Sequence, residues 1–238
     1  MNLPISIEPN PLISTAVELR FNSNLTSDQV LQTFYPKLIA SLPNFTSNDI
    51  PGVLKEQPEF SSSADYTFAN DKFSVSVGKS VVSFQNLNGY HFWKSYFSFI
   101  KDKLLELNSL NIVQEITRIG LRYISILDGT KNFEDALNIN FSLPEQIGFR
   151  STGKHHRVQF QKDNITIFIQ LWEGAKATRL DKKLEGLYVD ADVAIIDKLP
   201  QKIGDELFSN IDKIHSIEKE VFYSLLKPEF LKTLNPKY

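Results

Sequence analysis

Hydrophobic and polar positions follow two different periods along this chain, and the changes of period divide it into strands and helices. Alternation with a period of two predicts a strand over residues 13–21, because successive strand side chains point to opposite faces. Apolar positions between residues 30 and 39 instead recur at helical spacing. Thr26 and Gln29 just before them have the spacing of a capping box. We therefore expect a strand followed by a capped helix.

The middle of the chain repeats these changes of period. Polar residues from 44 to 64 indicate a long surface loop. Short alternating runs between turn residues then predict a three-stranded meander over 66–84. Helical spacing returns over 90–107, and alternation returns in a predicted strand over 111–127.

The second half follows a similar order, ending in a long helix. Its predicted elements are a strand at 138–142, a helical turn at 144–148, a hairpin at 154–172, a strand at 186–196 and a helix at 205–226. Meanders separated by long helices are typical of an α+β fold. We expect one compact domain over 1–238, with a largely antiparallel sheet and helices mainly on one face. Segments 12–110 and 111–228 are its two loosely repeated halves.

Composition narrows the classes of function. A chain of 238 residues buries a sizeable core, and the absence of Cys excludes disulfides and every thiolate site. No charged leader or long apolar run is present, so we expect a cytoplasmic protein without membrane association. The sequence has no phosphate loop, glycine-rich nucleotide turn, nucleophile elbow or His-Glu-x-x-His motif. No cofactor is expected.

Two charged pairs are the first candidates for a site. Alternation places Arg118 and Arg122 on one strand face with Gly120 between them, and it places Asp190 and Asp192 together on another strand. If the two strands are neighbours, these residues form cross-strand ion pairs without any function. Otherwise the arginines bind a phosphate or carboxylate, or the aspartates hold a divalent cation.

Residues 150–183 contain eight Lys and Arg residues against three acidic ones, although the net charge of the whole chain is only −2. Lys154, Arg157, Lys176 and Arg179 are candidates for contacts with an anion or with nucleic-acid phosphates. The alternative is that these basic residues form the solvated rim of the predicted hairpin and bind nothing.

The predicted helix over 90–107 carries more aromatic residues than one core-facing stripe needs. Trp93, Phe97 and Ile100 belong to that stripe. The surplus indicates that a second side is covered, by the predicted loop at 44–64 or by another subunit. The resulting candidates for an interaction surface are Tyr90, Phe92, Tyr96 and Phe99.

His215 lies in the last predicted helix, with Lys219 one turn further on. A helix-edge histidine with a partly packed ring is one interpretation. The other joins His215 to Asp190 and Asp192 as a weak set of metal ligands in a phosphate-ester enzyme, with the arginines holding the phosphate. We expect no metal site, because two carboxylates are a weak signature.

Five segments together resemble a sporadically distributed family of uncharacterised prokaryotic proteins of similar length, over nearly the whole chain. They are 11–21, Gly89-Tyr90-x-Phe92-Trp93, 118–124, 189–193 and His215-x-x-x-Lys219-x-x-Phe222. The resemblance implies no activity and no catalytic residues. The patchy distribution of the family resembles that of genes in mobile or defence-related loci.

The leading hypothesis is a non-enzymatic interaction protein that forms a homo-oligomer and contacts a protein partner, in a defence-related or mobile locus. The missing catalytic motifs and the surplus aromatic residues favour it. The alternative is a nucleic-acid, nucleotide or anion-binding protein that uses the arginine face and the basic segment.

Overall fold

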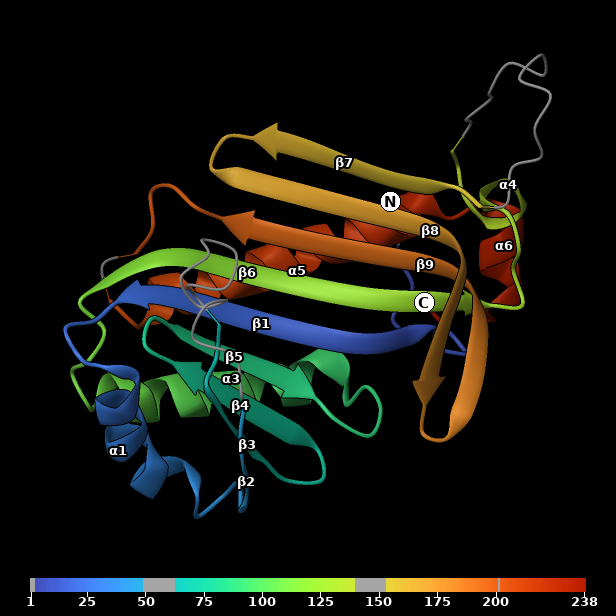
Figure 1. Cartoon of the computed structure of the whole chain (residues 1–238). Coiled ribbons are helices and arrows are strands. Elements are labelled where there is room, and N and C mark those ends of the chain that lie inside the picture. The colour runs from blue at the N-terminus through green and yellow to red at the C-terminus, as the bar shows by residue number, and fades with distance from the viewer. Residues whose placement is uncertain (1–2, 49–62, 140–152, 201) are drawn as a thin grey trace.

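The computed structural model describes residues 3–48, 63–139, 153–200 and 202–238, and in these residues the chain has an α+β fold (Figure 1). One antiparallel sheet contains the strands β1 (Leu12–Asn22), β2 (Asn44–Ser47), β3 (Tyr66–Ala69), β4 (Phe73–Gly78), β5 (Val81–Asn86), β6 (Glu115–Asp128), β7 (His155–Lys162), β8 (Ile165–Arg179) and β9 (Lys182–Ile195). The helices are α1 (Ser27–Leu38), α3 (Phe92–Asn108), α4 (Phe133–Ala136), α5 (Asp205–Leu225) and α6 (Pro228–Thr233).

The strands lie in the order β2-β3-β4-β5-β1-β6-β9-β8-β7, so β1 and β6 form the centre of the sheet. Each of these two strands pairs with the last strand of the meander that follows it, β5 and β9 respectively. A long helix, α3 or α5, comes directly after each meander in the chain. The two halves therefore have the same connectivity.

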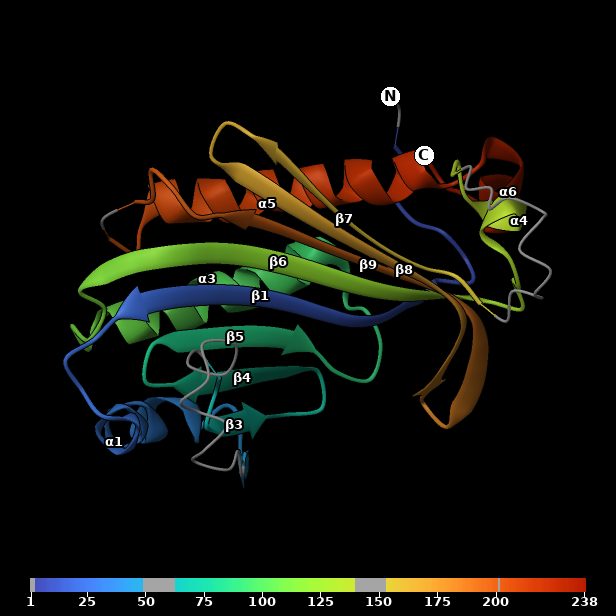
Figure 2. The ribbon, with the colours of Figure 1, turned by 45° about the horizontal axis from the view of Figure 1, so that its top comes forward.

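The helices α1, α3 and α5 share one sheet face with the larger hydrophobic core, and Figure 2 shows α3 and α5 along that face. Alternate residues of the central strands supply the sheet side of this core, as expected for strands with one apolar face. They include Val17, Leu19, Phe21, Ile119 and Leu121, all of which are buried. No helix among the described residues is both long and apolar enough to cross a membrane.

A second hydrophobic cluster lies at the end of the sheet near α4 and α6. It joins Leu127 and Leu187 of the sheet to Phe133 of α4 and to Leu226, which follows α5. Ile7, in the segment before β1, belongs to the same cluster. The core therefore has two parts.

The N-terminal segment, residues 3–11, crosses the helical side of the molecule and is anchored by backbone hydrogen bonds. The Ile5 amide donates to the carbonyl of Lys237 at 2.6 Å, and the Glu8 amide donates to the carbonyl of Leu234 at 2.7 Å. At the other end, the Ile126 amide of β6 donates to the carbonyl of Pro11 at 2.9 Å. The segment is thus fixed between the C-terminus and the central sheet.

Most predicted elements are present, and the capping box at Thr26 is confirmed. Four features differ from the predictions. Strand β2 lies inside the predicted loop 44–64, where it pairs with β3 although all four of its residues are exposed. The short helices α4 and α6 were not expected, and β8 and β9 extend past an irregularity after Trp172 to a turn at Leu180 and Asp181.

The predicted strand at 138–142 does not appear in its described part, since residues 138 and 139 are outside any strand. The rest of that strand and the predicted turn at 144–148 lie outside the described residues.

Candidate functional site

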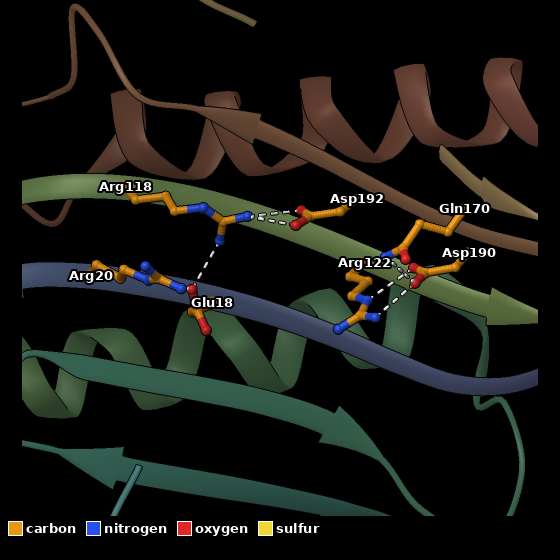
Figure 3. Close-up of polar contacts among 7 residues, drawn as sticks. All are labelled: Glu18, Arg20, Arg118, Arg122, Gln170, Asp190 and Asp192. Atoms are coloured by element: carbon orange, nitrogen blue, oxygen red, sulfur yellow. Dashed lines mark hydrogen bonds and ion pairs between the residues drawn. The ribbon is translucent and has the colours of Figure 1, made fainter. Parts of the chain in front are cut away.

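The two predicted arginines lie on the sheet face opposite the helices, which we call the charged face (Figure 3). Strands β6 and β9 are neighbours, so the arginines meet the predicted aspartates. Arg118 donates from Nη2 to both carboxyl oxygens of Asp192 at 2.8 and 2.9 Å, and from Nη1 to Glu18 at 2.9 Å. Glu18 also accepts from Arg20 at 2.7 Å.

Arg122 forms the second pair of the charged face. It donates to the two oxygens of Asp190 at 2.9 and 2.6 Å, and this pairing raises the pKa of Arg122. Asp190 is only 2% exposed and also accepts hydrogen bonds from Tyr188 at 3.1 Å and Gln170 at 3.4 Å. Asp190 is therefore fully engaged by the protein itself.

Gly120 leaves a gap between the arginines, as the sequence predicts, but Arg118 fills it. A Cβ atom at position 120 would lie 2.0 Å from Nη1 of Arg118. The glycine is needed because the guanidinium lies directly across it on the way to Glu18 and Asp192.

In the hydrogen-bonded set drawn in Figure 3, three arginines thus face three carboxylates, and the charges of these six residues balance. The interpretation as cross-strand ion pairs agrees with the geometry. Anion binding at Arg118 and Arg122 stays a prediction, and an anion there would have to displace carboxylates that already bind both guanidinium groups.

The basic segment is also partly neutralised by acidic residues from elsewhere in the chain. Lys154 lies 2.6 Å from Glu134, and Lys176 lies 3.6 Å from Glu185. The guanidinium of Arg157 lies over the ring of Phe168. Nucleic-acid binding by this segment stays a prediction.

Arg179 contacts the backbone of the segment before β1. Its Nη1 donates to the carbonyl oxygens of Asn10 at 2.6 Å and Leu12 at 2.9 Å. The tip of the β8–β9 hairpin is thereby tied to the end of the N-terminal segment.

The four aromatic interaction candidates have different surroundings. Phe92 is 61% exposed and therefore available to a partner. Tyr96 differs from the prediction: it is fully buried, and its hydroxyl donates to the carbonyl of Phe84. Phe99 stacks on Phe73 with ring centroids 4.5 Å apart. The core face of α3 is centred on Tyr96, so only part of the aromatic surplus reaches the surface.

The weak metal-ligand set is not brought together. Asp190 and Asp192 lie on the charged face, whereas His215 lies on α5, on the other side of the sheet. The described residues contain no group of three or more His, Asp or Glu side chains that fits a metal ion. The geometry contradicts a phosphate-ester site built on these three residues.

A cavity of about 340 Å³ lies on the helical side of the sheet, between the N-terminal segment, the start of α3, β6 and α5. We call it the aromatic cavity because rings from three of these elements line it. The ring-bearing residues in its wall are Tyr90, Phe92, Trp93, Tyr123, His215, Phe222 and Tyr223. Its lining combines residues of both hydrophobic clusters, so the cavity lies where the two parts of the core meet.

Glu218 is the unexpected member of the wall. It is 3% exposed and lines the cavity, yet its carboxyl makes no hydrogen bond or ion pair with any described residue. Burial raises the pKa of Glu218 to about 8, and the neighbouring Lys219 offsets this only in part. The protein thus keeps an ionisable group in the cavity without a partner for its charge.

The aromatic wall is itself held in place by specific contacts. Trp93 donates from its indole nitrogen to Asp212 at 2.7 Å and stacks on His215, with centroids 3.8 Å apart and planes 2° from parallel. The hydroxyls of Tyr90 and Tyr123 lie 3.2 Å apart, and burial raises the pKa of both. These rings are therefore fixed by contacts with one another and, for Trp93, with Asp212 outside the cavity.

His215 contributes a neutral ring to this wall. Burial lowers its pKa to about 4, which outweighs the opposite effect of Asp212. The imidazole is therefore uncharged at neutral pH and acts as an aromatic surface. Its partly packed position on α5 agrees with the interpretation as a helix-edge histidine.

The backbone at the mouth of the cavity is strained. Phe92 has a φ of 56°, a conformation that a bulky residue rarely adopts. Strain of this kind costs about 1–3 kcal/mol and is concentrated at functional sites. It presents the exposed Phe92 ring at the edge of the aromatic cavity.

No protein-family model matches this chain, and no curated protein does. The resemblance to a family of uncharacterised proteins therefore stays a prediction. Four of the five segments that carry the resemblance contribute to the lining of the aromatic cavity, through Pro11 and Leu12, Tyr90 to Trp93, Tyr123, and His215 to Phe222.

Sequence reasoning missed Glu218, although a signal for it exists. The apolar stripe of α5 contains Leu207, Ile211 and Ile214 and continues at Val221, and position 218 falls inside the stripe. A glutamate at a core position of an amphipathic helix indicates a buried charge, which needs an explanation. Trp93 was assigned to the core only, because nothing in the sequence reveals a cavity beside it.

Proposed function

We propose that this chain is a non-enzymatic binding protein whose ligand occupies the aromatic cavity. One observation carries the proposal: the buried Glu218 carboxyl lines a ring-walled cavity and has no partner among the described residues. A carboxyl on an almost fully buried residue that faces a cavity, with no partner in the described chain, is a group that a ligand can complete.

The size and lining of the cavity support this proposal. Small-molecule sites are concave, mostly apolar and about 300–1,000 Å³ in volume, with a few polar groups that orient the ligand. The aromatic cavity, at about 340 Å³, suits a ligand of the size of a substituted benzene ring. The Glu218 carboxyl and the Tyr90 and Tyr123 hydroxyls are its orienting groups.

The test uses three related probes: 2-phenylethylamine, 2-phenylethanol and phenylacetate, which present a cation, a neutral hydroxyl and an anion on the same ring. Saturation-transfer NMR detects their binding to the native chain. The Ser6→Trp variant fills the cavity from the N-terminal segment, since Ser6 lines it. Ser109→Trp, at an exposed position after the far end of α3, is the matched control.

We expect at least one probe to bind the native chain and Ser109→Trp, and to lose binding in Ser6→Trp. If none of the three binds, or if Ser6→Trp binds as well as the control, the cavity is not a ligand site and the proposal fails.

Self-association is our second candidate, with a copy of this chain pairing along β7. Among the described residues, β7 lies at the end of the sheet and pairs only with β8. Its outer edge offers unpaired backbone donors and acceptors, and Val158 and Phe160 are 43% and 52% exposed. Antiparallel pairing of two β7 strands satisfies both edges at once.

Light scattering on the purified chain tests this second candidate. We expect a dimer that Phe160→Lys converts to a monomer, while Gln159→Lys, on the other face of the same exposed strand, leaves it dimeric. A native chain that is monomeric at all concentrations would exclude pairing through β7.

A further inference from the structure

We infer that the ligand of the aromatic cavity carries an alkylammonium group, with Glu218 as its counter-ion and the surrounding rings as its cage. This inference rests on the proposed function and specifies the chemistry of the ligand. It depends on three properties of the cavity: a buried carboxyl, the absence of a cation that pairs with it among the described residues, and several aromatic faces.

The carboxyl needs a partner that the described part of the chain does not supply. A buried carboxylate is costly unless a cation or hydrogen-bond donors compensate for it. Lys219 is the next residue in the chain and Lys94 also lines the cavity, yet neither forms an ion pair with Glu218 among the described residues, and Lys219 offsets the raised pKa of Glu218 only in part. A cation entering the cavity would provide the missing charge.

The rings around Glu218 suit the same cation. An ammonium group is attracted to the faces of Trp and Tyr rings, and the attraction is strongest where water is excluded. Tyr90 lies just before α3, Trp93 belongs to α3 and Tyr123 to β6. Phe222 and Tyr223 lie on the helix that carries Glu218. The neutral His215 ring, stacked on Trp93, adds no positive charge that would repel a cation.

An anionic ligand fits this cavity less well. The two lysines of the lining are on its more accessible side, since Lys94 is exposed and Lys219 is half-buried, whereas Glu218 is 3% exposed. An anion deep enough to contact the rings would lie beside a carboxyl that offers it no opposite charge, whereas a cation gains an ion pair once Glu218 gives up its proton. The buried carboxyl therefore favours cations.

Binding of the cation is coupled to ionisation of Glu218. The titratable and charged groups that face it are Tyr90 and Lys94 near the start of α3, Tyr123 of β6, and His215, Lys219 and Tyr223 of α5. The described part of the N-terminal segment contributes no titratable side chain to the lining. Because Glu218 holds its proton up to a pH of about 8 in the free chain, an ammonium ligand that binds at pH 7 displaces that proton.

The experiment compares the affinities of the same three probes by fluorescence. The chain has two tryptophans, so the Trp172→Phe variant keeps Trp93 as its only one, in the wall of the cavity. In this background we expect 2-phenylethylamine to bind at least about tenfold more tightly than 2-phenylethanol, with phenylacetate weakest.

Glu218→Gln, added to that background, removes the charge and keeps the shape. We expect it to weaken amine binding by about tenfold or more and to change alcohol binding by less than about twofold. Glu220→Gln is the matched control, because Glu220 is an exposed carboxylate two residues away on the same helix. It should leave all three affinities unchanged.

Calorimetry on the native chain gives a measurement that needs no variant. At pH 7, titrations in phosphate and in Tris should show nearly one proton released per 2-phenylethylamine bound, and none for 2-phenylethanol.

Two outcomes separate this inference from the proposed function. If amine and alcohol bind equally, without proton release, and Ser6→Trp blocks both, the cavity is a ligand site and the cation inference is wrong. If no probe binds at all, the proposed function itself fails.

Discussion

The charged face and the aromatic cavity lie on opposite sides of the same central strand, and they differ in whether their ionisable groups are paired. On the charged face, Arg118 and Arg122 are each bound by carboxylates at 2.6 to 2.9 Å. In the cavity, Glu218 is buried among rings without a partner in the described chain. Arg118 and Arg122 thus have their partners within the protein, whereas Glu218 has none among the described residues.

A cluster of charged side chains is therefore a poor guide to a binding site in this protein. A set of charges that the protein balances internally gains little from a ligand, because each new contact must replace an existing one. A buried carboxyl without a partner in the described chain, in a concave apolar site, gains from a ligand that stabilises its ionised form. The following predictions test whether the two regions differ in this way.

We expect the largest effect in the pH dependence of stability, which Glu218→Gln should change more than any other substitution. The folded pKa of Glu218, about 8, lies above its ordinary value of 4.5. Below pH 4.5 both the folded and the unfolded chain keep the proton. As pH rises to 8, only the unfolded chain loses it, so the native chain loses up to about 5 kcal/mol of stability. Above pH 8 the loss is complete.

Urea denaturation at pH 4.5 and pH 8.5 measures this effect. The free energy of unfolding of Glu218→Gln, relative to that of the native chain, should rise between these two values. Glu220→Gln serves as the exposed control. A constant difference between Glu218→Gln and the native chain would mean that Glu218 is compensated after all.

Arg118→Met tests the charged face and should have the next largest effect. The side chain of Arg118 is 16% exposed, and its removal takes away the guanidinium that Asp192 binds and leaves Glu18 with Arg20 as its guanidinium partner. We expect a loss of about 2–3 kcal/mol in the free energy of unfolding, less than for a fully buried pair. The more exposed Arg20→Met should cost no more than about 1 kcal/mol. If urea denaturation shows equal losses of unfolding free energy for Arg118→Met and Arg20→Met, the ion pairs of Arg118 are no more stabilising than the exposed pair of Arg20.

Gly120→Ala should act through Arg118 alone. The added Cβ meets the end of the Arg118 side chain, which is flexible and moves away at the expense of its ion pairs. We expect a cost of about 1–2 kcal/mol in the native background. In the Arg118→Met background the cost should nearly vanish, and a double-mutant cycle measures this coupling. Additive costs would show that Gly120 serves another purpose.

Arg179→Ala links the basic hairpin to the cavity and should have the smallest effect on stability. It removes two hydrogen bonds to the backbone at Asn10 and Leu12, for a loss of about 1 kcal/mol. Because these residues line the aromatic cavity, amine binding should weaken as well. Lys183→Ala, an exposed basic residue of the same hairpin, should change neither property. If Arg179→Ala and Lys183→Ala behave identically in denaturation and in amine titration, Arg179 does not support the cavity.

The fold followed from the sequence wherever the period of apolar residues was clear. The alternation around Arg118 and Asp190 predicted which side chains share a face, and the Thr26 capping box placed the start of α1. Strand β2 was missed because its residues are all exposed, and exposed strands carry no apolar alternation.

The candidate site was much less predictable than the fold. Tyr90 and His215 were noted, but their meeting depends on how α3 and α5 pack on β6, which local periodicity does not determine. Arg179 appeared to be one of several surface cations, and only the folded hairpin brings it to the backbone of Leu12. Glu218 could have been found as a charge in a core stripe.

NMR titration of the Glu218 carboxyl carbon, with and without saturating 2-phenylethylamine, is the most direct test of the central claim. The account predicts a midpoint near pH 8 in the free chain and a fall of at least about two pH units when the amine is bound. A midpoint near 4.5 in the free chain would contradict the claim of an unpartnered buried carboxyl. A midpoint that does not respond to the amine would contradict its role as the counter-ion.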